Sequence, residues 1–327
     1  MRLTDIDMRT VSANKLAPFL VAGHADAAES CRVLASLFAN AGGSTKLFPM
    51  YAKVLEPLLA LAKTEPAALP PLATAGRMAW AISAYPETRA CLSVVCAVTS
   101  EVPHAVWAAG VPWDRTREPM TVSRERAMLQ LYLAESLLAE GDEPAGEALF
   151  AEAIATPELP GYLRVSPTMY DYGTPADFRL HALARAARAL RLRHQGLDAC
   201  AGRKPPRRKP GSVPDGRQLT MAQAYVEKAL AVIGPRVVEQ YAGLIPDTTF
   251  AHPGLTLAHK DYLWQWRVFF EAALVDELAG RTERARVRLG KAKLLAALNE
   301  PTHHYERELR EAVARLGAVN TPLDAPA

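Results

Sequence analysis

Residues Arg124 to Ala155, RERAMLQLYLAESLLAEGDEPAGEALFAEAIA, decide the fold of this chain. The stretch holds two runs of apolar residues at helical spacing, joined at Gly141-Asp142. Small residues stand where two helices would cross closely, a glycine stands at the turn, and a large apolar residue stands where the next helix would pack. These positions are Ala134, Gly141, Gly146, Phe150 and Ala153. The spacing is typical of a tetratricopeptide helix-turn-helix unit.

The same spacing occurs again near the end of the chain. In WQWRVFFEAALVDELAGRTERARVRLGKAKLL, residues 264–295, the matching positions are Ala273, Gly280, Ala285, Leu289 and Ala292. A third unit is predicted from a helix over 178–197 and a partner helix over 219–233. That partner repeats the second-helix spacing at Ala222, Val226 and Ala229. The sequence therefore predicts an array of helical hairpins.

The remaining segments also favour helices. Apolar periodicity predicts helices over 26–41, 46–63, 73–83 and 86–107, after a short extended stretch near Leu3. Half of the residues are apolar and only 7% are aromatic, a balance that favours helix over strand. We expect a single all-α domain over residues 1–327, a curved array of helical hairpins.

A basic stretch, RKPPRRKP at 203–210, interrupts the third predicted hairpin. Its five cations are Arg203, Lys204, Arg207, Arg208 and Lys209. Because prolines and like charges resist packing, residues 201–218 are expected to form a long loop between the two helices. The loop contains no aromatic residue, so it lacks the stacking contacts of single-strand binding. Three alternatives remain open for this loop: it binds RNA phosphate, it binds an acidic protein surface, or it has no partner.

The cysteines point to a reducing compartment. Cys31, Cys91, Cys96 and Cys200 form no CxxC pair, and buried free thiols are the plainer interpretation. No apolar run approaches the length of a membrane span, and the first residues lack the apolar core of a secretory signal. We expect an intracellular protein, in the cytoplasm or alternatively in the mitochondrial matrix.

No group of residues predicts catalysis. His303, His304, Glu306 and Glu308 do not have a defensible metal spacing. The carboxylates of the first hairpin are expected on exposed faces rather than in an acid/base pair, namely Glu135, Glu140, Asp142 and Glu143. The aromatic cluster of Trp264, Trp266, Phe269 and Phe270 is expected in the core. The sequence therefore predicts a protein that is not an enzyme and has no cofactor, no metal and no small-molecule substrate.

In order along the chain, five segments resemble the BRO domain, the Alix-like family of helical scaffold modules. They are IDMRTVSANKLAPFL (6–20), MYAKVLEPLLALAKTEPAALP (50–70), AYPETRACLSVVCAVTSE (84–101), RLHALARAARALRL (179–192) and TERARVRLGKAKLL (282–295). The third matches the family's central helix at Glu87, Leu92, Ala97 and Ser100, and the fourth matches its "LAQAQE" helix at Leu183, Ala184 and Ala186. The fifth matches at Ala285, Arg288, Leu289 and Ala292.

The resemblance implies a non-enzymatic adaptor that binds helices of membrane-remodelling ESCRT filament subunits. The family's apolar patch lies around its "LAQAQE" helix, where this chain has Leu190, Arg191 and Leu192. Candidate partner-binding residues are Leu190, Leu197, Val226 and Leu230, on the helices that flank the basic loop. Core packing is the plainer interpretation of these apolar residues. The alternative function is a structural subunit of a large assembly, for example an organellar ribonucleoprotein, with the basic loop on RNA or an acidic partner.

Overall fold

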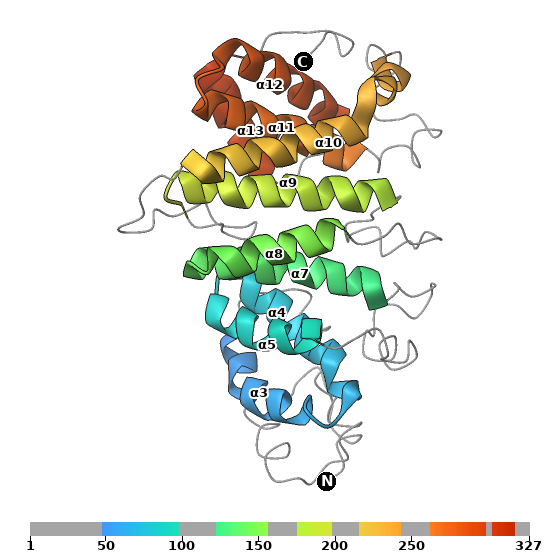
Figure 1. Ribbon diagram of the computed structural model, residues 1–327, viewed down its shortest axis with the longest axis vertical. Coiled ribbons are helices and arrows are strands. Elements are labelled where there is room, and N and C mark those ends of the chain that lie inside the picture. The colour runs from blue at the N-terminus through green and yellow to red at the C-terminus, as the bar shows by residue number, and fades with distance from the viewer. Residues whose placement is uncertain are drawn as a thin grey trace. The chain divides into compact units, whose positions relative to one another are not determined.

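The computed structural model describes residues 48–97, 122–155, 175–197, 216–242, 262–298 and 303–317 (Figure 1). Within these ranges the chain forms ten α-helices and one 3₁₀ turn, and no strand. The all-α prediction is thereby confirmed for the described part of the chain. The extended stretch near Leu3, the helix expected over 26–41 and the basic loop lie outside it.

Backbone contacts divide the chain into two compact units. The first comprises residues 1–156 with 163–170, and the second comprises 157–162 with 171–327. The single domain expected from the sequence stays a prediction.

The first unit contains a run of helices in which each packs on the next. They are α3 (Phe48–Leu61), the 3₁₀ turn η3 (Pro66–Ala68), α4 (Leu69–Ala81), α5 (Tyr85–Ala97), α7 (Val122–Glu140) and α8 (Glu143–Ile154). Helix α4 packs on α5, α5 on α7, and α7 on α8. Leu58, Leu72 and Leu92 are fully buried between them. A Cβ added at Gly76 would overlap Cδ2 of Leu92, so α4 and α5 approach closely at this glycine.

The first predicted hairpin is confirmed as α7–α8. Gly141 has a φ of 96°, and the amide of Asp142 donates to the carbonyl of Leu137 at 2.9 Å. This is the bond pattern that ends a helix at a left-handed residue, where glycine carries no steric cost. Beyond the turn, a Cβ on Gly146 would lie 2.9 Å from the carbonyl oxygen of Ala134. The small residues predicted at the helix crossing are therefore required by the packing.

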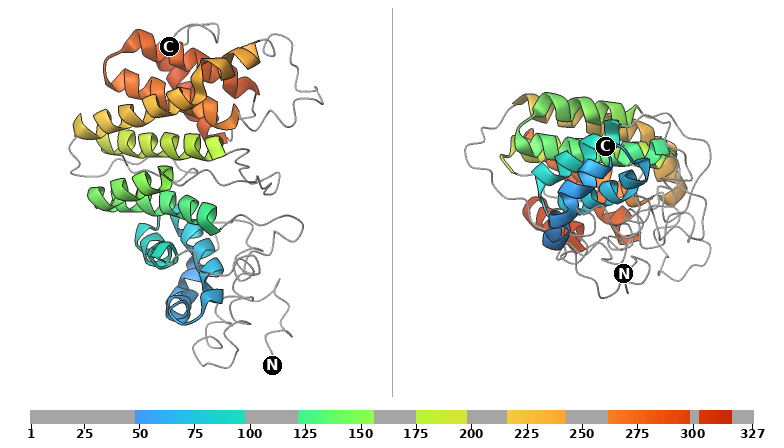
Figure 2. Two further views of the ribbon diagram at one scale, coloured as in Figure 1. Left: turned by 45° about the vertical axis from the view of Figure 1, so that its right-hand side comes forward. Right: turned by 90° about the horizontal axis from the view of Figure 1, so that it is seen from below.

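The second unit contains the other two hairpins, shown from further angles in Figure 2. Its helices are α9 (Pro175–His194), α10 (Gly216–Ala242), α11 (Tyr262–Leu278), α12 (Thr282–Leu298) and α13 (His303–Leu316). Helix α9 pairs with α10 and α11 pairs with α12, while both α9 and α10 also pack on α11. Trp266, Phe269 and Phe270 are buried as expected, whereas the side chain of Trp264 is outside the described set.

Helix α13 packs on α12 through one apolar face. Leu309, Ala312 and Leu316 are buried, while Arg307 and Arg310 remain exposed. Helix α13 therefore has one apolar and one polar face.

Candidate functional site: an arginine cluster around Asp276

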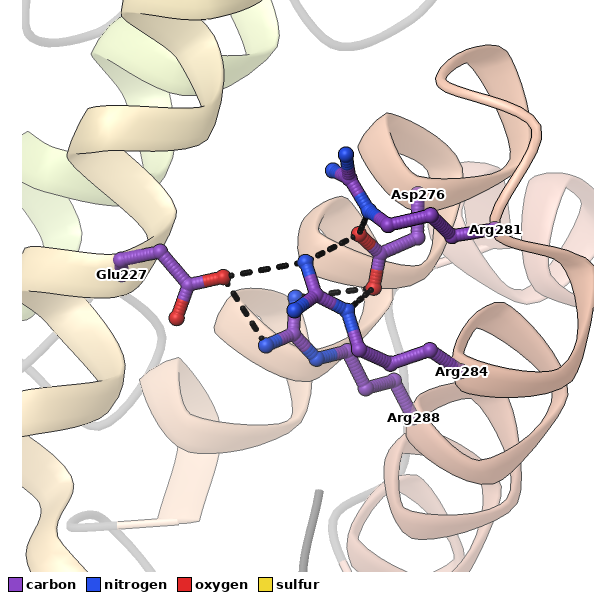
Figure 3. Close-up of polar contacts among 5 residues, drawn as sticks. All are labelled: Glu227, Asp276, Arg281, Arg284 and Arg288. Carbon is purple, nitrogen blue, oxygen red and sulfur yellow. Dashed lines mark hydrogen bonds and ion pairs between the residues drawn. The ribbon is translucent and has the colours of Figure 1, made fainter.

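Asp276 is a carboxylate with no exposed surface, near the end of α11. Its Oδ1 accepts hydrogen bonds from Arg281 Nε at 2.8 Å and from Arg284 Nη2 at 2.6 Å (Figure 3). Its Oδ2 accepts from Arg284 Nε at 2.7 Å and forms an ion pair with Arg288 Nη1 at 2.9 Å. A carboxylate offers about four acceptor positions, and Asp276 uses three of them for hydrogen bonds and has a fourth contact in the ion pair with Arg288.

The local backbone places the arginines around the carboxylate. Gly280, with a φ of 74°, ends α11, and the amide of Arg281 donates to the carbonyl of Asp276 at 2.9 Å. Helix α12 begins at Thr282, and Arg284 and Arg288 are four residues apart, so both point to one side of that helix. The turn and the helical spacing together bring three cations to one acid.

Two opposing effects act on the pKa of Asp276. Burial favours the neutral carboxyl, which would raise the pKa. Hydrogen bonds from Arg284 and Arg281, and the charges of Arg288 and Arg284, favour the carboxylate and outweigh burial. The pKa of Asp276 is therefore lowered from its ordinary value, and this carboxyl stays ionised at neutral pH.

Glu227 on α10 joins the cluster from a different hairpin. Its Oε1 accepts from Arg288 Nη2 at 3.0 Å and from Arg284 Nη2 at 3.3 Å (Figure 3). Unlike Asp276, Glu227 has a partly exposed side chain, at 44%. The cluster thus links the α9–α10 hairpin to the α11–α12 hairpin.

The first hairpin offers an internal comparison, because the two tetratricopeptide-like units align position by position. Leu137 stands where the second has Asp276, and Leu149 stands where it has Arg288. Leu137 is buried and Leu149 is half-buried. The same helical hairpin therefore forms with either an apolar pair or an ionic cluster. Because hydrophobic replacement of a buried ion pair is often neutral or stabilising, the hairpin itself does not explain the cluster.

A second ionic network connects α9, α11 and α13 within the same unit. Arg191 on α9 donates to Glu271 on α11 through Nε at 2.8 Å and Nη2 at 3.3 Å, and both side chains are buried. Arg188 lies 3.8 Å from Glu271 and donates to Glu308 on α13 at 3.3 Å. Two-point recognition by a planar guanidinium fixes orientation as well as distance. These contacts therefore specify how three helices meet.

The predicted partner-binding residues do not form one exposed surface. Leu190 and Val226 have no exposed surface and pack in the core of the second unit. Leu197 and Leu230 are half-buried and keep some accessible area. The basic loop residues Arg203, Lys204, Arg207, Arg208 and Lys209 lie outside the described residues. Of the four apolar candidates, only Leu197 and Leu230 can therefore contact a partner without rearrangement.

One carboxylate of the first hairpin lies elsewhere than expected. Glu135 is buried rather than exposed, and its Oε2 accepts a hydrogen bond from the indole Nε1 of Trp80 at 2.7 Å. Glu140 is exposed and lies 3.6 Å from Arg89. The expectation failed at Glu135 because helical spacing alone does not reveal an indole from another helix.

The thiols of α5 are buried and unpaired, as the sequence predicted. Burial raises the pKa of Cys91 and of Cys96 to about 12. For Cys91 the nearby Glu87 adds to this effect. Thiols with so high a pKa are poor nucleophiles at neutral pH.

Among the described residues, no group of three or more His, Cys, Asp or Glu could hold a metal ion. Helix α13 begins at His303, whose side chain, like those of His304 and Glu306, is outside the described set. In the same part of the chain, no helix has both the length and the apolar character that crossing a bilayer requires.

The fold and the cluster define an all-α protein of helical hairpins whose second unit is held by buried arginine–carboxylate networks. Comparison with protein-family models, with curated proteins and with solved structures found no match for this chain.

Proposed function

We propose that this chain is a non-enzymatic scaffold that binds other proteins, an adaptor of the BRO type. The observation that supports it most directly is the pair of ionic networks in the second unit. They connect the α9–α10 hairpin to α11, α12 and α13 through Asp276 and Glu271. A hairpin array exposes helix faces for partners, and fixed angles between the hairpins keep such a surface in one shape.

The partner surface is proposed along the α9–α10 hairpin, whose two helices the basic loop connects. Leu197 follows α9, and Leu230 lies on α10, the two helices that the loop connects. An amphipathic helix bound by a hairpin contributes apolar side chains to such positions. In the BRO resemblance, the partner is a helix of an ESCRT filament subunit.

The alternative, a structural subunit of a ribonucleoprotein, is supported by the charge of the second unit. That unit holds 24 lysines and arginines against 18 acidic residues, a net charge of +6. The first unit holds 14 against 17, a net charge of −3. A local excess of positive charge suits contact with phosphate or with an acidic protein.

Affinity purification of the full chain at low and high salt distinguishes the two functions. An adaptor retains helical protein partners at high salt and loses them on Leu230→Asp. The matched control is Leu149→Asp, which changes a half-buried leucine on the second helix of the first hairpin. A ribonucleoprotein subunit retains RNA only at low salt and loses it when Arg207, Arg208 and Lys209 are replaced by alanine. If neither protein nor RNA depends on these residues, both functions are refuted.

A further inference from the structure

Helix α13 is attached to the second unit by a small apolar contact. Of its described side chains, Leu309, Ala312 and Leu316 are buried, and the others are exposed or half-buried. Helix α11 is the opposite case, because every side chain from Gln265 to Asp276 is buried. Helix α13 has 14 residues, and isolated helices shorter than about 12–15 residues are marginal in water. It therefore depends on its contacts with the rest of the unit to stay folded.

Two ion pairs join α13 to helices α9 and α11. Arg315 donates from Nε and Nη2 to the two carboxylate oxygens of Glu277 on α11, at 2.6 and 2.8 Å. Nearer the start of α13, Glu308 accepts from Arg188 on α9 at 3.3 Å. The Arg315 side chain is 52% exposed and that of Glu277 is 24% exposed, so solvent and salt reach this pair. Ion pairs as exposed as this one stabilise a fold only modestly and weaken as salt rises.

Two arginines that contact α13 each have a second carboxylate partner elsewhere in the second unit. Arg188 also lies 3.8 Å from the buried carboxylate of Glu271 on α11. Arg286, near the start of α12, donates to the carbonyl oxygen of Leu316 at 2.7 Å and also to Glu283 on its own helix at 2.9 Å. Departure of α13 therefore leaves both arginines paired with a carboxylate.

We propose that α13 is a detachable helix, which undocks while α9 to α12 stay folded and is replaced by a helix of a partner protein. The surface that it covers fits apolar side chains at the positions of Leu309, Ala312 and Leu316, which lie on one face of a helix. The same surface offers Arg188 to an acid and Glu277 to a base. The partner is therefore an amphipathic helix with the pattern of α13.

Docked α13 blocks this surface, so the apparent affinity for the partner helix falls in proportion to the fraction of chains that are open. Helix α13 thus controls how readily the chain binds its partner. The proposal goes beyond the surface along the α9–α10 hairpin, and it rests on the proposed function only in taking a protein as the partner.

Hydrogen exchange of the full chain, measured by mass spectrometry, tests whether α13 opens by itself. We expect its amides to exchange faster than those of α11, and a rise from about 0.1 M to about 1 M salt to speed exchange more in α13 than in α11. Arg315→Ala should raise the exchange rate in α13 about twofold to fivefold and leave α11 unchanged. Exchange in α13 that is as slow as in α11, or that is unaffected by salt or by Arg315→Ala, overturns the proposal.

The matched control is Arg307→Ala, which removes an arginine from the same helix. Arg307 lies 3.6 Å from Glu311 within α13, and its side chain is 47% exposed. This substitution should leave exchange in α13 close to that of the original chain. An increase as large as that of Arg315→Ala would show a loss of helicity rather than undocking, and would overturn the proposal.

A fluorescent peptide of residues 303–317 tests the surface that α13 covers, with anisotropy as the readout. In the full chain with Leu309→Asp and Leu316→Asp, α13 cannot dock, so the peptide should bind this variant at least about tenfold more tightly than the original chain. Arg315→Ala, which keeps the apolar face, should bind the peptide about twofold to fivefold more tightly. A peptide with the same two aspartates should not bind. Equal affinity of the peptide for all three chains overturns the proposal.

These measurements need no natural partner, and none of the substitutions changes Leu230 or the basic loop. If α13 does not open, the adaptor function along the α9–α10 hairpin still stands. If no protein partner depends on Leu230, the proposed function fails, while exchange and peptide binding still report on α13.

Discussion

Removal of the Asp276 carboxylate tests whether the arginine cluster stabilises the folded second unit. In Asp276→Ala, three guanidinium groups lose their common acceptor, and Arg288, with a side chain only 3% exposed, cannot turn to solvent. Breaking a buried ion pair by removing one partner costs about 3–5 kcal/mol. We therefore expect the free energy of unfolding of the second unit to fall by about 4 kcal/mol.

The matched variant is Asp276→Leu with Arg288→Leu, which copies the apolar pair Leu137 and Leu149 of the first hairpin. It removes the buried charge together with its acceptor, while Arg281 and Arg284, each about one third exposed, can reach water. Apolar replacement of a buried ion pair is often neutral or stabilising. The double variant should therefore recover most of the stability that Asp276→Ala loses.

Urea unfolding followed by circular dichroism measures both variants. With a slope of about 2 kcal/mol per molar urea, a loss of about 4 kcal/mol lowers the midpoint of the affected transition by about 2 M. If Asp276→Ala changes the free energy of unfolding by less than about 0.5 kcal/mol, the size of an ordinary surface substitution, the arginine cluster does not stabilise the fold. A double variant no more stable than Asp276→Ala would show that the two hairpins are not interchangeable at this position.

Three further predictions concern pH, helix crossing and a turn. Because the pKa of Asp276 is lowered in the folded protein, its contribution to the free energy of unfolding is fully present above the unfolded pKa of about 3.9 and is lost as pH falls through the lower folded pKa. When stability is measured against pH, Asp276→Leu with Arg288→Leu should therefore lose less stability in acid than the original chain, and equal losses would contradict this. Gly146→Ala should lower the free energy of unfolding by about 1–3 kcal/mol, measured by thermal or urea unfolding, because its Cβ would lie 2.9 Å from the carbonyl oxygen of Ala134. The control Gly216→Ala has nothing within 4 Å of its Cβ and should be tolerated, and similar effects of the two substitutions would refute the close helix crossing. Ser83 ends α4 with a φ of 64°, so Ser83→Gly should raise the free energy of unfolding by about 0.5–1 kcal/mol, and a lower melting temperature would argue against it.

The hairpins could be predicted from the sequence because their signals are local. Gly141 and Gly280 adopt the left-handed conformation that only glycine takes without strain, and the small residues at the crossing follow within one or two helical turns. Such patterns depend on neighbours along the chain, so the two hairpins were placed without knowledge of the rest.

The site could not be predicted in the same way. Three arginines follow the aspartate in the sequence, at Arg281, Arg284 and Arg288, but their spacing does not show that all three reach one buried carboxylate. Glu227 lies 57 positions before Arg284, and no local spacing links them. Long-range packing decides which carboxylate an arginine reaches.

The same limit explains the placement of Leu190 and Val226. Helical periodicity identifies the apolar side of α9 and of α10, but it does not reveal how many neighbours cover that side. Both helices pack on each other and on α11, and these two residues have no exposed surface. The prediction of partner contact therefore remains only at Leu197 and Leu230, which keep accessible area.

Four contacts on one carboxylate also constrain how this hairpin can vary. A change from the ionic to the apolar filling requires at least two substitutions, and the first of them leaves either Asp276 with two of its three arginines or three arginines without their acid. In the first case Arg281 and Arg284 still make their hydrogen bonds to Asp276. In the second case the buried Arg288 loses Asp276, so this intermediate is the less stable one. The two hairpins of this chain, alike in backbone, are therefore connected in sequence space through replacement of Arg288 first, and Asp276 is not expected to change while Arg288 remains.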